Sequence, residues 1–208
     1  MIAVDHVTVI LGGRPILQDF SLNVGRGQCV GLLGPSGSGK STLLRTLVGE
    51  LMPSKGSVSL ASWQPVPTKM RLPPPGLVSM VFQDPIGALD PLWNIGQCVA
   101  EPLQSLSLTE RNERIKASLG AVKLGHVPLK ASVRTLSVCQ AQRVCIARAI
   151  APRPKVILAD EPTSALDATT SASVVRLLHQ ASVQGASILV VSHNAALLES
   201  FCSTVVSL

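Results

Sequence analysis

Residues 34–42 read Gly-Pro-Ser-Gly-Ser-Gly-Lys-Ser-Thr, and this glycine-rich stretch constrains the fold more than any other part of the chain. Four of its residues match the spacing G-x-x-x-x-G-K-[ST], namely Gly34, Gly39, Lys40 and Ser41. Because glycine carries no side chain, backbone N–H groups at these positions can approach phosphate oxygens closely. The sequence therefore predicts a loop that wraps around the phosphates of a nucleotide.

The segments on either side of this loop fit the same interpretation. The apolar run 28–33 predicts a buried strand that leads into the loop, and residues 41–48 have helical periodicity. A helix that starts there would direct the positive end of its dipole at the phosphate. We expect Lys40 to contact the β- and γ-phosphates and the Ser41 hydroxyl to ligate Mg²⁺. The predicted nucleotide contacts comprise the whole loop: Gly34, Pro35, Ser36, Gly37, Ser38, Gly39, Lys40, Ser41 and Thr42.

Composition limits the class of protein. At 208 residues, the chain suits one large domain or one domain with a subdomain. With 46% hydrophobic and only 14% charged residues it is apolar, so we expect a partner to cover part of its surface. It has no run of 18 apolar residues and no signal-peptide layout, which favours a cytoplasmic protein without a membrane span. Five scattered cysteines suggest neither a disulfide framework nor a metal site.

The net charge of +6 does not by itself indicate nucleic acid. The Lys and Arg residues are dispersed, and three Phe, two Trp and no Tyr offer few platforms for base stacking. Binding of a polyanionic nucleotide, or contact with an anionic membrane face, accounts for the positive charge. We therefore expect no nucleic-acid partner.

Strand and helix patterns alternate in both flanks of the chain. Residues 2–10 and 16–24 alternate apolar and polar, which predicts two antiparallel strands joined by a turn at 12–15. Further strands are expected at 57–60, 77–82, 156–159, 187–191 and 204–208, and further helices at 172–183 and 195–201. This order predicts a three-layer α/β fold whose central sheet is mostly parallel.

The middle of the chain has a different character. Five prolines make residues 64–76 irregular: Pro65, Pro67, Pro73, Pro74 and Pro75. After Asp84, helices are expected at 109–123, with Thr109 as N-cap, and at 141–151. We expect a single domain, 1–208, in which residues 1–83 and 152–208 form the core with its antiparallel part and residues 84–151 form a helical subdomain.

Two adjacent carboxylates end one of the predicted strands. The apolar run from Val156 leads directly to Asp160 and Glu161. In a phosphate-loop fold, an acid at the carboxyl end of a neighbouring strand reaches the Mg²⁺ ion, which suits Asp160. Glu161 points elsewhere and can polarise the water that attacks the γ-phosphate. Taken alone, two such carboxylates are also common as helix caps. The presence of the phosphate loop in the same chain is what favours a catalytic role for them.

Six motifs stand in the order that is typical of one family. They are the loop at 34–42, Gln83, Leu136-Ser-Val-Cys-Gln140, Asp160-Glu161, Ser164-Ala-Leu-Asp167 and His193. Together they span nearly the whole chain, which resembles the nucleotide-binding subunit of an ATP-binding cassette (ABC) transporter. The resemblance implies a P-loop NTPase core, ATP and Mg²⁺ as cofactors, and ATP hydrolysis coupled to transport.

The resemblance also implies roles for individual residues. Gln83 would contact Mg²⁺ and the attacking water and report nucleotide binding to the membrane partner, and His193 would bond the γ-phosphate. In this family ATP is held between two subunits, so Ser137 and Gln140 would face the nucleotide of the partner. The loop ending at Asp167 would cross the dimer interface.

The implied partners are a second ABC subunit, membrane-spanning permease subunits and a solute-binding protein, at the cytoplasmic face of the inner membrane. The segment 81–92 is similar to that of importers for peptides, nickel and related metal chelates. Two alternatives stay open. One is a weakened regulatory subunit of a heterodimeric transporter, in which restored glycines would raise ATPase activity. The other is an ABC ATPase without transport function.

The chain departs from the family pattern at two places. Val138 and Cys139 replace the two glycines of the usual signature, and both side chains fill space where glycine lets phosphate approach. Val138 is also intolerant of positive φ. The aromatic residue that usually stacks on adenine is absent from the first hairpin, where Leu11 stands instead. Leucine keeps an apolar contact with the base but loses the stacking energy.

Overall fold

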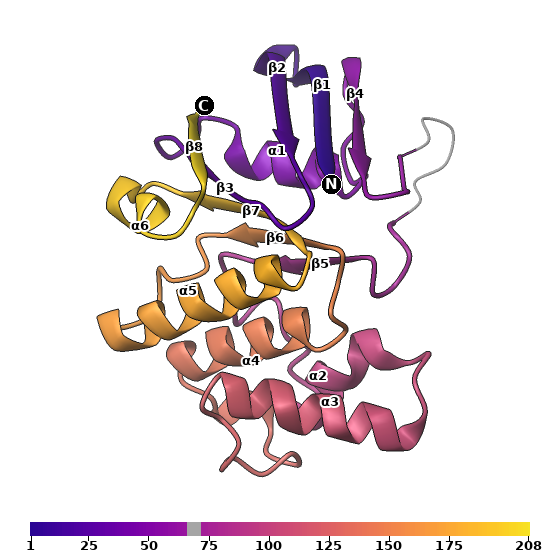
Figure 1. Ribbon diagram of the computed structural model, residues 1–208, viewed down its shortest axis with the longest axis vertical. Coiled ribbons are helices and arrows are strands. Elements are labelled where there is room, and N and C mark those ends of the chain that lie inside the picture. Colours follow the sequence, from indigo (N-terminus) through magenta and orange to yellow (C-terminus); the bar gives the residue numbers. More distant parts are fainter. Residues whose placement is uncertain (66–71) are drawn as a thin grey trace.

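The computed structural model of the chain describes residues 1–65 and 72–208 (Figure 1). The central part of the stretch expected to be irregular, including Pro67, lies outside the described residues. Within the described ranges, no helix has both the length and the apolar character needed to cross a membrane.

Three antiparallel strands form one sheet at the N-terminal side of the molecule. The strands β1 (Ile2–Leu11), β2 (Arg14–Val24) and β4 (Lys55–Leu60) pair in the order β2-β1-β4. Alternate apolar residues of β1, such as Val7 and Val9, are fully buried, as the alternating pattern predicts. The predicted hairpin turn is present, and Gly12 and Gly13 both adopt positive φ there.

Five parallel strands form the second sheet, in the order β5-β6-β7-β3-β8. They are β3 (Cys29–Leu33), β5 (Val78–Val81), β6 (Val156–Asp160), β7 (Ser187–Ser192) and β8 (Thr204–Ser207). Every residue of β6 and β7 is buried, which is typical of parallel strands covered on both faces. The expected parallel sheet is confirmed. However, β6 is not the immediate neighbour of β3, because β7 lies between them.

Helices cover both faces of the parallel sheet (Figure 1). On one face, α1 (Lys40–Leu47) packs between the two sheets, and its leucines share a core with Val4 of β1 and Leu32 of β3. On the opposite face, Val174 and Leu178 of α5 (Ala168–Val183) and Leu198 of α6 (Ala195–Glu199) join a second core. The position of α1 fixes where the preceding loop lies.

The remaining helices gather at one end of the molecule, next to the second core (Figure 1). They are α2 (Ile95–Ala100), η1 (Glu101–Leu103), α3 (Leu108–Ala121), η2 (Val133–Thr135) and α4 (Val138–Ile150). The sequence interpretation missed α2, although Asn94 and Gln97 form a capping box at its start.

Three helices begin earlier than expected, each because a side chain upstream caps the first turn. Ser107, not Thr109, caps α3, through a reciprocal bond with Glu110. In the same way, Ser137 caps α4, which begins at Val138 rather than at 141. Asp167 caps α5, which begins at Ala168 rather than at 172.

Candidate active site

The glycine-rich loop connects β3 to α1 and depends on backbone conformations that favour glycine. Gly37 has φ 82° and Gly39 has φ 103°. A Cβ atom on Gly39 would lie 2.9 Å from Leu17 Cδ2, and one on Gly34 would lie 2.6 Å from Ser38 Oγ. The loop therefore presents backbone rather than side chains at these positions.

The first turn of α1 is left without a side-chain cap. Its N-cap is Gly39, which has no side chain to accept from the first N–H groups. The α-helices α2 to α6 of the described chain all have such a cap, from Asn94, Ser107, Ser137, Asp167 and Asn194 respectively. Unsatisfied N–H groups together with the helix dipole make the start of α1 suited to an anion.

Lys40 is the first residue of α1 and is only 8% exposed. Its Nζ donates hydrogen bonds of 2.7 Å to the carbonyl oxygens of Gly34 and Pro35. An ammonium group has three N–H donors, so Lys40 can hold the loop closed and contact a phosphate oxygen at the same time.

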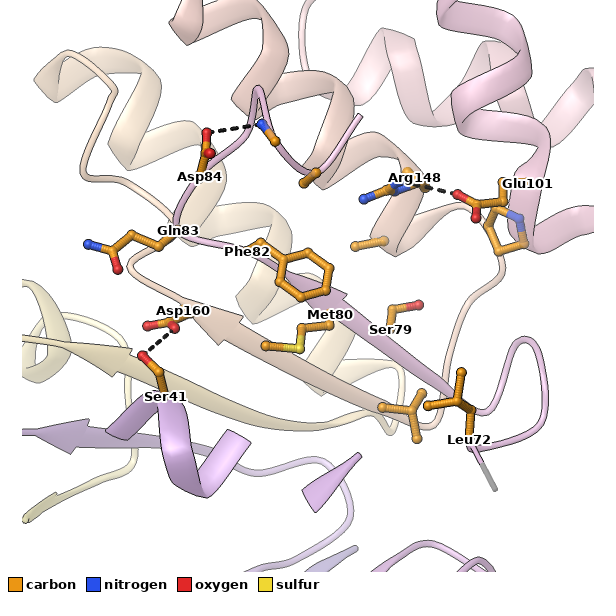
Figure 2. A pocket seen from close by; sticks show the side chains of 15 residues that line it. Ser41, Leu72, Ser79, Met80, Phe82, Gln83, Asp84, Glu101, Arg148 and Asp160 are labelled. Carbon is orange, nitrogen blue, oxygen red and sulfur yellow. Dashed lines mark hydrogen bonds and ion pairs between the residues drawn. The ribbon is translucent and has the colours of Figure 1, made fainter. Parts of the chain in front are cut away.

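Asp160, at the end of β6, lies against the start of α1. The Ser41 hydroxyl donates to Asp160 Oδ2 at 2.8 Å, although β7 separates β6 from β3 in the sheet (Figure 2). Burial and the neighbouring Glu161 charge raise the pKa of Asp160, whereas the bond from Ser41 and the charge of Lys40 oppose that shift.

The pair formed by Ser41 and Asp160 fits a magnesium ion. A hydroxyl and a carboxylate are hard oxygen ligands of the kind that Mg²⁺ prefers. Across the described residues, no group of three or more His, Cys, Asp or Glu side chains is arranged to hold a metal ion. A site with few protein ligands suits Mg²⁺, since this ion keeps several waters and binds substrate phosphates.

Glu161 is held in a strained backbone conformation with its carboxylate fixed. Its φ is 47°, and such a conformation for a residue other than glycine costs about 1–3 kcal/mol. Glu161 Oε2 accepts from Ser192 Oγ at 2.9 Å, and Oε1 accepts from the His193 backbone N–H at 2.8 Å. The His193 Nδ1 atom lies 2.7 Å from the same Oε1.

These contacts bring His193 and Glu161 together, and they reveal a residue that the sequence interpretation missed. Ser192, at the end of β7, is 1% exposed and bonds the Glu161 carboxylate directly. Its position next to His193 was the available signal. The Glu161 side chain is 9% exposed and that of His193 is 70% exposed, so the histidine extends from the carboxylate toward solvent.

Gln83 follows β5 and lines a cavity of about 920 Å³. Figure 2 shows Gln83, Ser41 and Asp160 at one end of this cavity. The other end is lined by Leu72 and by Glu101 and Arg148, which form an ion pair with a distance of 3.1 Å. The structure thus brings Gln83 to the same space as the Ser41–Asp160 pair.

The remaining predicted site residues do not line this cavity. Ser137 and Gln140 lie in the first turn of α4, where each bonds the backbone N–H of the other. Asp167 accepts bonds from the N–H and hydroxyl of Thr170 at the start of α5. Leu11 ends β1 and is 38% exposed.

The expectations for Val138 and Cys139 need correction. Both residues belong to α4, and neither has positive φ, so a β-branched side chain causes no backbone strain there. The Val138 side chain is exposed, at 51%, but the Cys139 thiol turns inward and donates to the carbonyl oxygen of Ala165 at 2.8 Å. Of the two side chains that were expected to hinder the approach of a phosphate, only that of Val138 is exposed.

Comparison with known proteins agrees with this arrangement. The profile of the family described as ABC transporter matches residues 17–164. The nickel import ATP-binding protein NikE of Escherichia coli (strain K12) is 38% identical over 199 residues, which cover 92% of this chain and 74% of that protein. NikE of Shigella boydii serotype 4 (strain Sb227) is 39% identical over 198 residues, with the same coverage.

Solved structures share the whole fold. The dimeric post-hydrolysis structure of the ATP-binding cassette MJ0796, bound to ADP and Pi, superimposes with a TM-score of 0.87. It is 30% identical in sequence, and the match covers 100% of this chain and 94% of that one. The fold and the sequence agree on one conclusion: the chain belongs to the ABC transporter family, as an ATP-binding subunit that hydrolyses ATP.

Proposed function

We propose that the chain powers the import of a solute across a membrane by nucleotide-dependent dimerisation with a second ABC subunit. The observation that carries this proposal is the contact of Ser41 with Asp160 beside the buried Lys40. These two oxygen-bearing side chains lie at the uncapped start of α1, which supports a magnesium–nucleotide site there. Binding of ATP would favour the closed dimer, and hydrolysis would reopen it.

The proposed solute is nickel, a related metal chelate or a peptide. The similarity to NikE, a nickel import ATP-binding protein, supports this choice. The segment 81–92 supports it as well, because it is similar to that of importers for these solutes. In such a complex the chain would lie at the cytoplasmic face of the cell membrane, with permease subunits and a solute-binding protein as partners.

Ser41, Asp160 and Gln83 are the residues proposed to hold Mg²⁺. When bound, Mg²⁺ neutralises negative charge on the phosphate oxygens of ATP. Lys40 would bind the β- and γ-phosphates through its ammonium group. The first N–H groups of α1 would orient the same phosphates.

Glu161 is the proposed acceptor for the proton of the attacking water. Ser192 and the backbone of His193 fix both carboxylate oxygens, so the group is oriented before the nucleotide binds. The exposed imidazole of His193 would reach the γ-phosphate. The Glu161–His193 contact thus links the proposed base to the proposed phosphate ligand.

The dimer would complete the site. Ser137 and Gln140 at the start of α4 would face the nucleotide held by the partner subunit, and Asp167 would lie at the interface. Phe82, which lines the cavity next to Gln83, is 38% exposed, and Ile86, in the segment after Gln83, is 51% exposed. We assign this apolar surface to a permease subunit, which would place that partner next to Gln83.

The decisive experiment replaces the carboxylate of Glu161. In the complex with its membrane subunits, Glu161→Gln should reduce steady-state ATP hydrolysis by more than about 100-fold while nucleotide binding persists. The amide keeps the size of the side chain but cannot accept the proton. Glu199→Gln, at the exposed end of α6, is the matched control and should hydrolyse ATP at the wild-type rate.

Retained turnover in Glu161→Gln would remove Glu161 from the mechanism.

The competing function is a regulatory subunit, whose segment 136–140 would make ATP hydrolysis slow at the site of its partner subunit. The exposure of Val138 supports that alternative, because in the dimer its side chain would stand where a glycine would admit a phosphate.

A further inference from the structure

Two side chains of α4 bond the loop that follows Glu161. The Cys139 thiol donates to the Ala165 carbonyl oxygen at 2.8 Å, and Gln142 Nε2 donates to the Pro162 carbonyl oxygen at 3.1 Å. Residues three apart lie on the same face of a helix, so both donors point from α4 to the same loop. We name these two contacts the α4 clamp.

The loop from 162 to 167 directly follows a residue with a strained backbone. Glu161 has φ 47°, and a strained residue keeps its conformation only when the surrounding structure holds it. On one side, the Glu161 backbone N–H bonds the Val191 carbonyl at 2.9 Å, and its carboxylate bonds Ser192 and His193. On the other side, the next residue, Pro162, is held by Gln142.

The buried amide of Gln142 points to positioning rather than to stability. Gln142 is 0% exposed, and within the described residues its Oε1 atom has no hydrogen-bond partner. An apolar side chain of similar length would fill the same space without leaving a buried acceptor unpaired. The observable benefit of the amide is therefore its bond to Pro162.

Cys139 acts on the other end of the same loop. The signature of the family has glycine here, and glycine has no donor to offer. In this chain the thiol turns away from the outer surface of α4 and holds Ala165, two residues before Asp167, which caps α5. The cysteine thus joins segment 136–140 to loop 162–167 within one subunit.

We propose that Cys139 and Gln142 are positioning residues, which hold loop 162–167 and the adjoining Glu161 in the geometry for hydrolysis. This inference rests on the function proposed above, in which both segments meet the partner subunit. The clamp would make the α4 segment and the loop move together when the dimer closes. Neither residue needs to touch the nucleotide for this role.

Kinetics of the complex with its membrane subunits test the clamp. Cys139→Ala should lower kcat about three- to tenfold with KM for ATP nearly unchanged, because the phosphate loop is not altered. Cys139→Ser keeps a donor at the same place and should stay within about twofold of the wild type. Cys98→Ala, a fully buried cysteine of α2, is the control and should leave kcat unchanged.

Gln142→Met provides a second, independent variant. It should lower kcat by about tenfold without lowering Tm appreciably, since it also removes the unpaired Oε1 atom. Combined with Cys139→Ala, it should lower kcat by less than the product of the two single effects, because both residues hold one loop. A drop in kcat that merely follows Tm, or equal kcat in Cys139→Ala and the wild type, overturns the proposal.

Amide hydrogen exchange separates this proposal from the function on which it rests. In the full chain, loop 163–167 should exchange faster in Cys139→Ala than in Cys139→Ser or the wild type. Equal exchange in all three proteins overturns the clamp even if ATP is hydrolysed. Conversely, a wild-type complex that does not hydrolyse ATP refutes the proposed function, while faster exchange in Cys139→Ala would still support the clamp.

Discussion

Two helix N-termini of this chain, those of α1 and α4, are proposed to face nucleotide phosphates, and they are built in opposite ways. The start of α1 has Gly39 as N-cap and no side-chain cap, so its first N–H groups remain available. The start of α4 is satisfied internally, because Ser137 and Gln140 bond each other's backbone N–H groups. An exposed Val138 stands on that turn as well.

This contrast indicates that a helix dipole alone is not enough to make a phosphate site. Both helices have a positive dipole end at their first turn, but only α1 combines the dipole with uncapped N–H groups and a lysine. We therefore expect α1 to bind the nucleotide tightly and α4 to contribute weakly. The following variants test this contrast, starting with the largest expected effect.

Removal of Lys40 should strongly weaken nucleotide binding at the start of α1. Lys40→Ala loses the ammonium that bonds the carbonyl oxygens of Gly34 and Pro35, so the loop opens and the phosphates lose a charge-assisted contact. We expect kcat/KM for ATP to fall more than about 100-fold. Steady-state ATPase assays measure this, with Lys116→Ala, at an exposed position of α3, as the charge-matched control. Wild-type kinetics in Lys40→Ala would contradict our assignment of the site.

Removal of the Val138 side chain should strengthen the contact that the start of α4 makes with the partner's nucleotide. Val138→Gly clears the exposed side chain from the first turn, so backbone N–H groups can approach the phosphate of the partner subunit. We expect ATPase activity of the assembled transporter to rise about three- to tenfold. Because the Cys139 thiol faces inward, a glycine at that position should bring no such gain.

The control for this variant is Val183→Gly, which removes an exposed valine from the last residue of α5. Its ATPase activity should match that of the wild type. If Val138→Gly also matches the wild type, the valine is tolerated and the regulatory alternative loses its main support.

The smallest effect concerns the adenine base, beyond the phosphates. Leu11→Tyr would supply an aromatic ring at the exposed end of β1. Stacking should tighten ATP binding by about two- to tenfold. Equilibrium titration with ATP measures this, and Ile10→Tyr, whose side chain points to the opposite face of the strand, serves as control. Equal affinities in the two variants would show that Leu11 is not next to the base.

Local signals were strong enough to predict the larger elements. The alternation in residues 2–10 and the apolar runs that lead to Leu33 and Asp160 predicted the strands of both sheets. Helix starts were less predictable, because a cap acts through one side chain. Ser107 caps α3 so that it begins at Leu108 rather than at 109, and Asp167 caps α5 so that it begins at Ala168 rather than at 172. The short helix α2 was not predicted at all.

The phosphate loop and the family could be predicted from the sequence alone, because glycine spacing and the order of motifs along the chain are visible without coordinates. Which distant groups meet depends on the tertiary structure. Ser41 and Asp160, 119 positions apart, and Glu161 and His193, 32 apart, come together only when the strands line up. The same holds for the contact of Cys139 with Ala165, since a helix turns each side chain by a fixed angle.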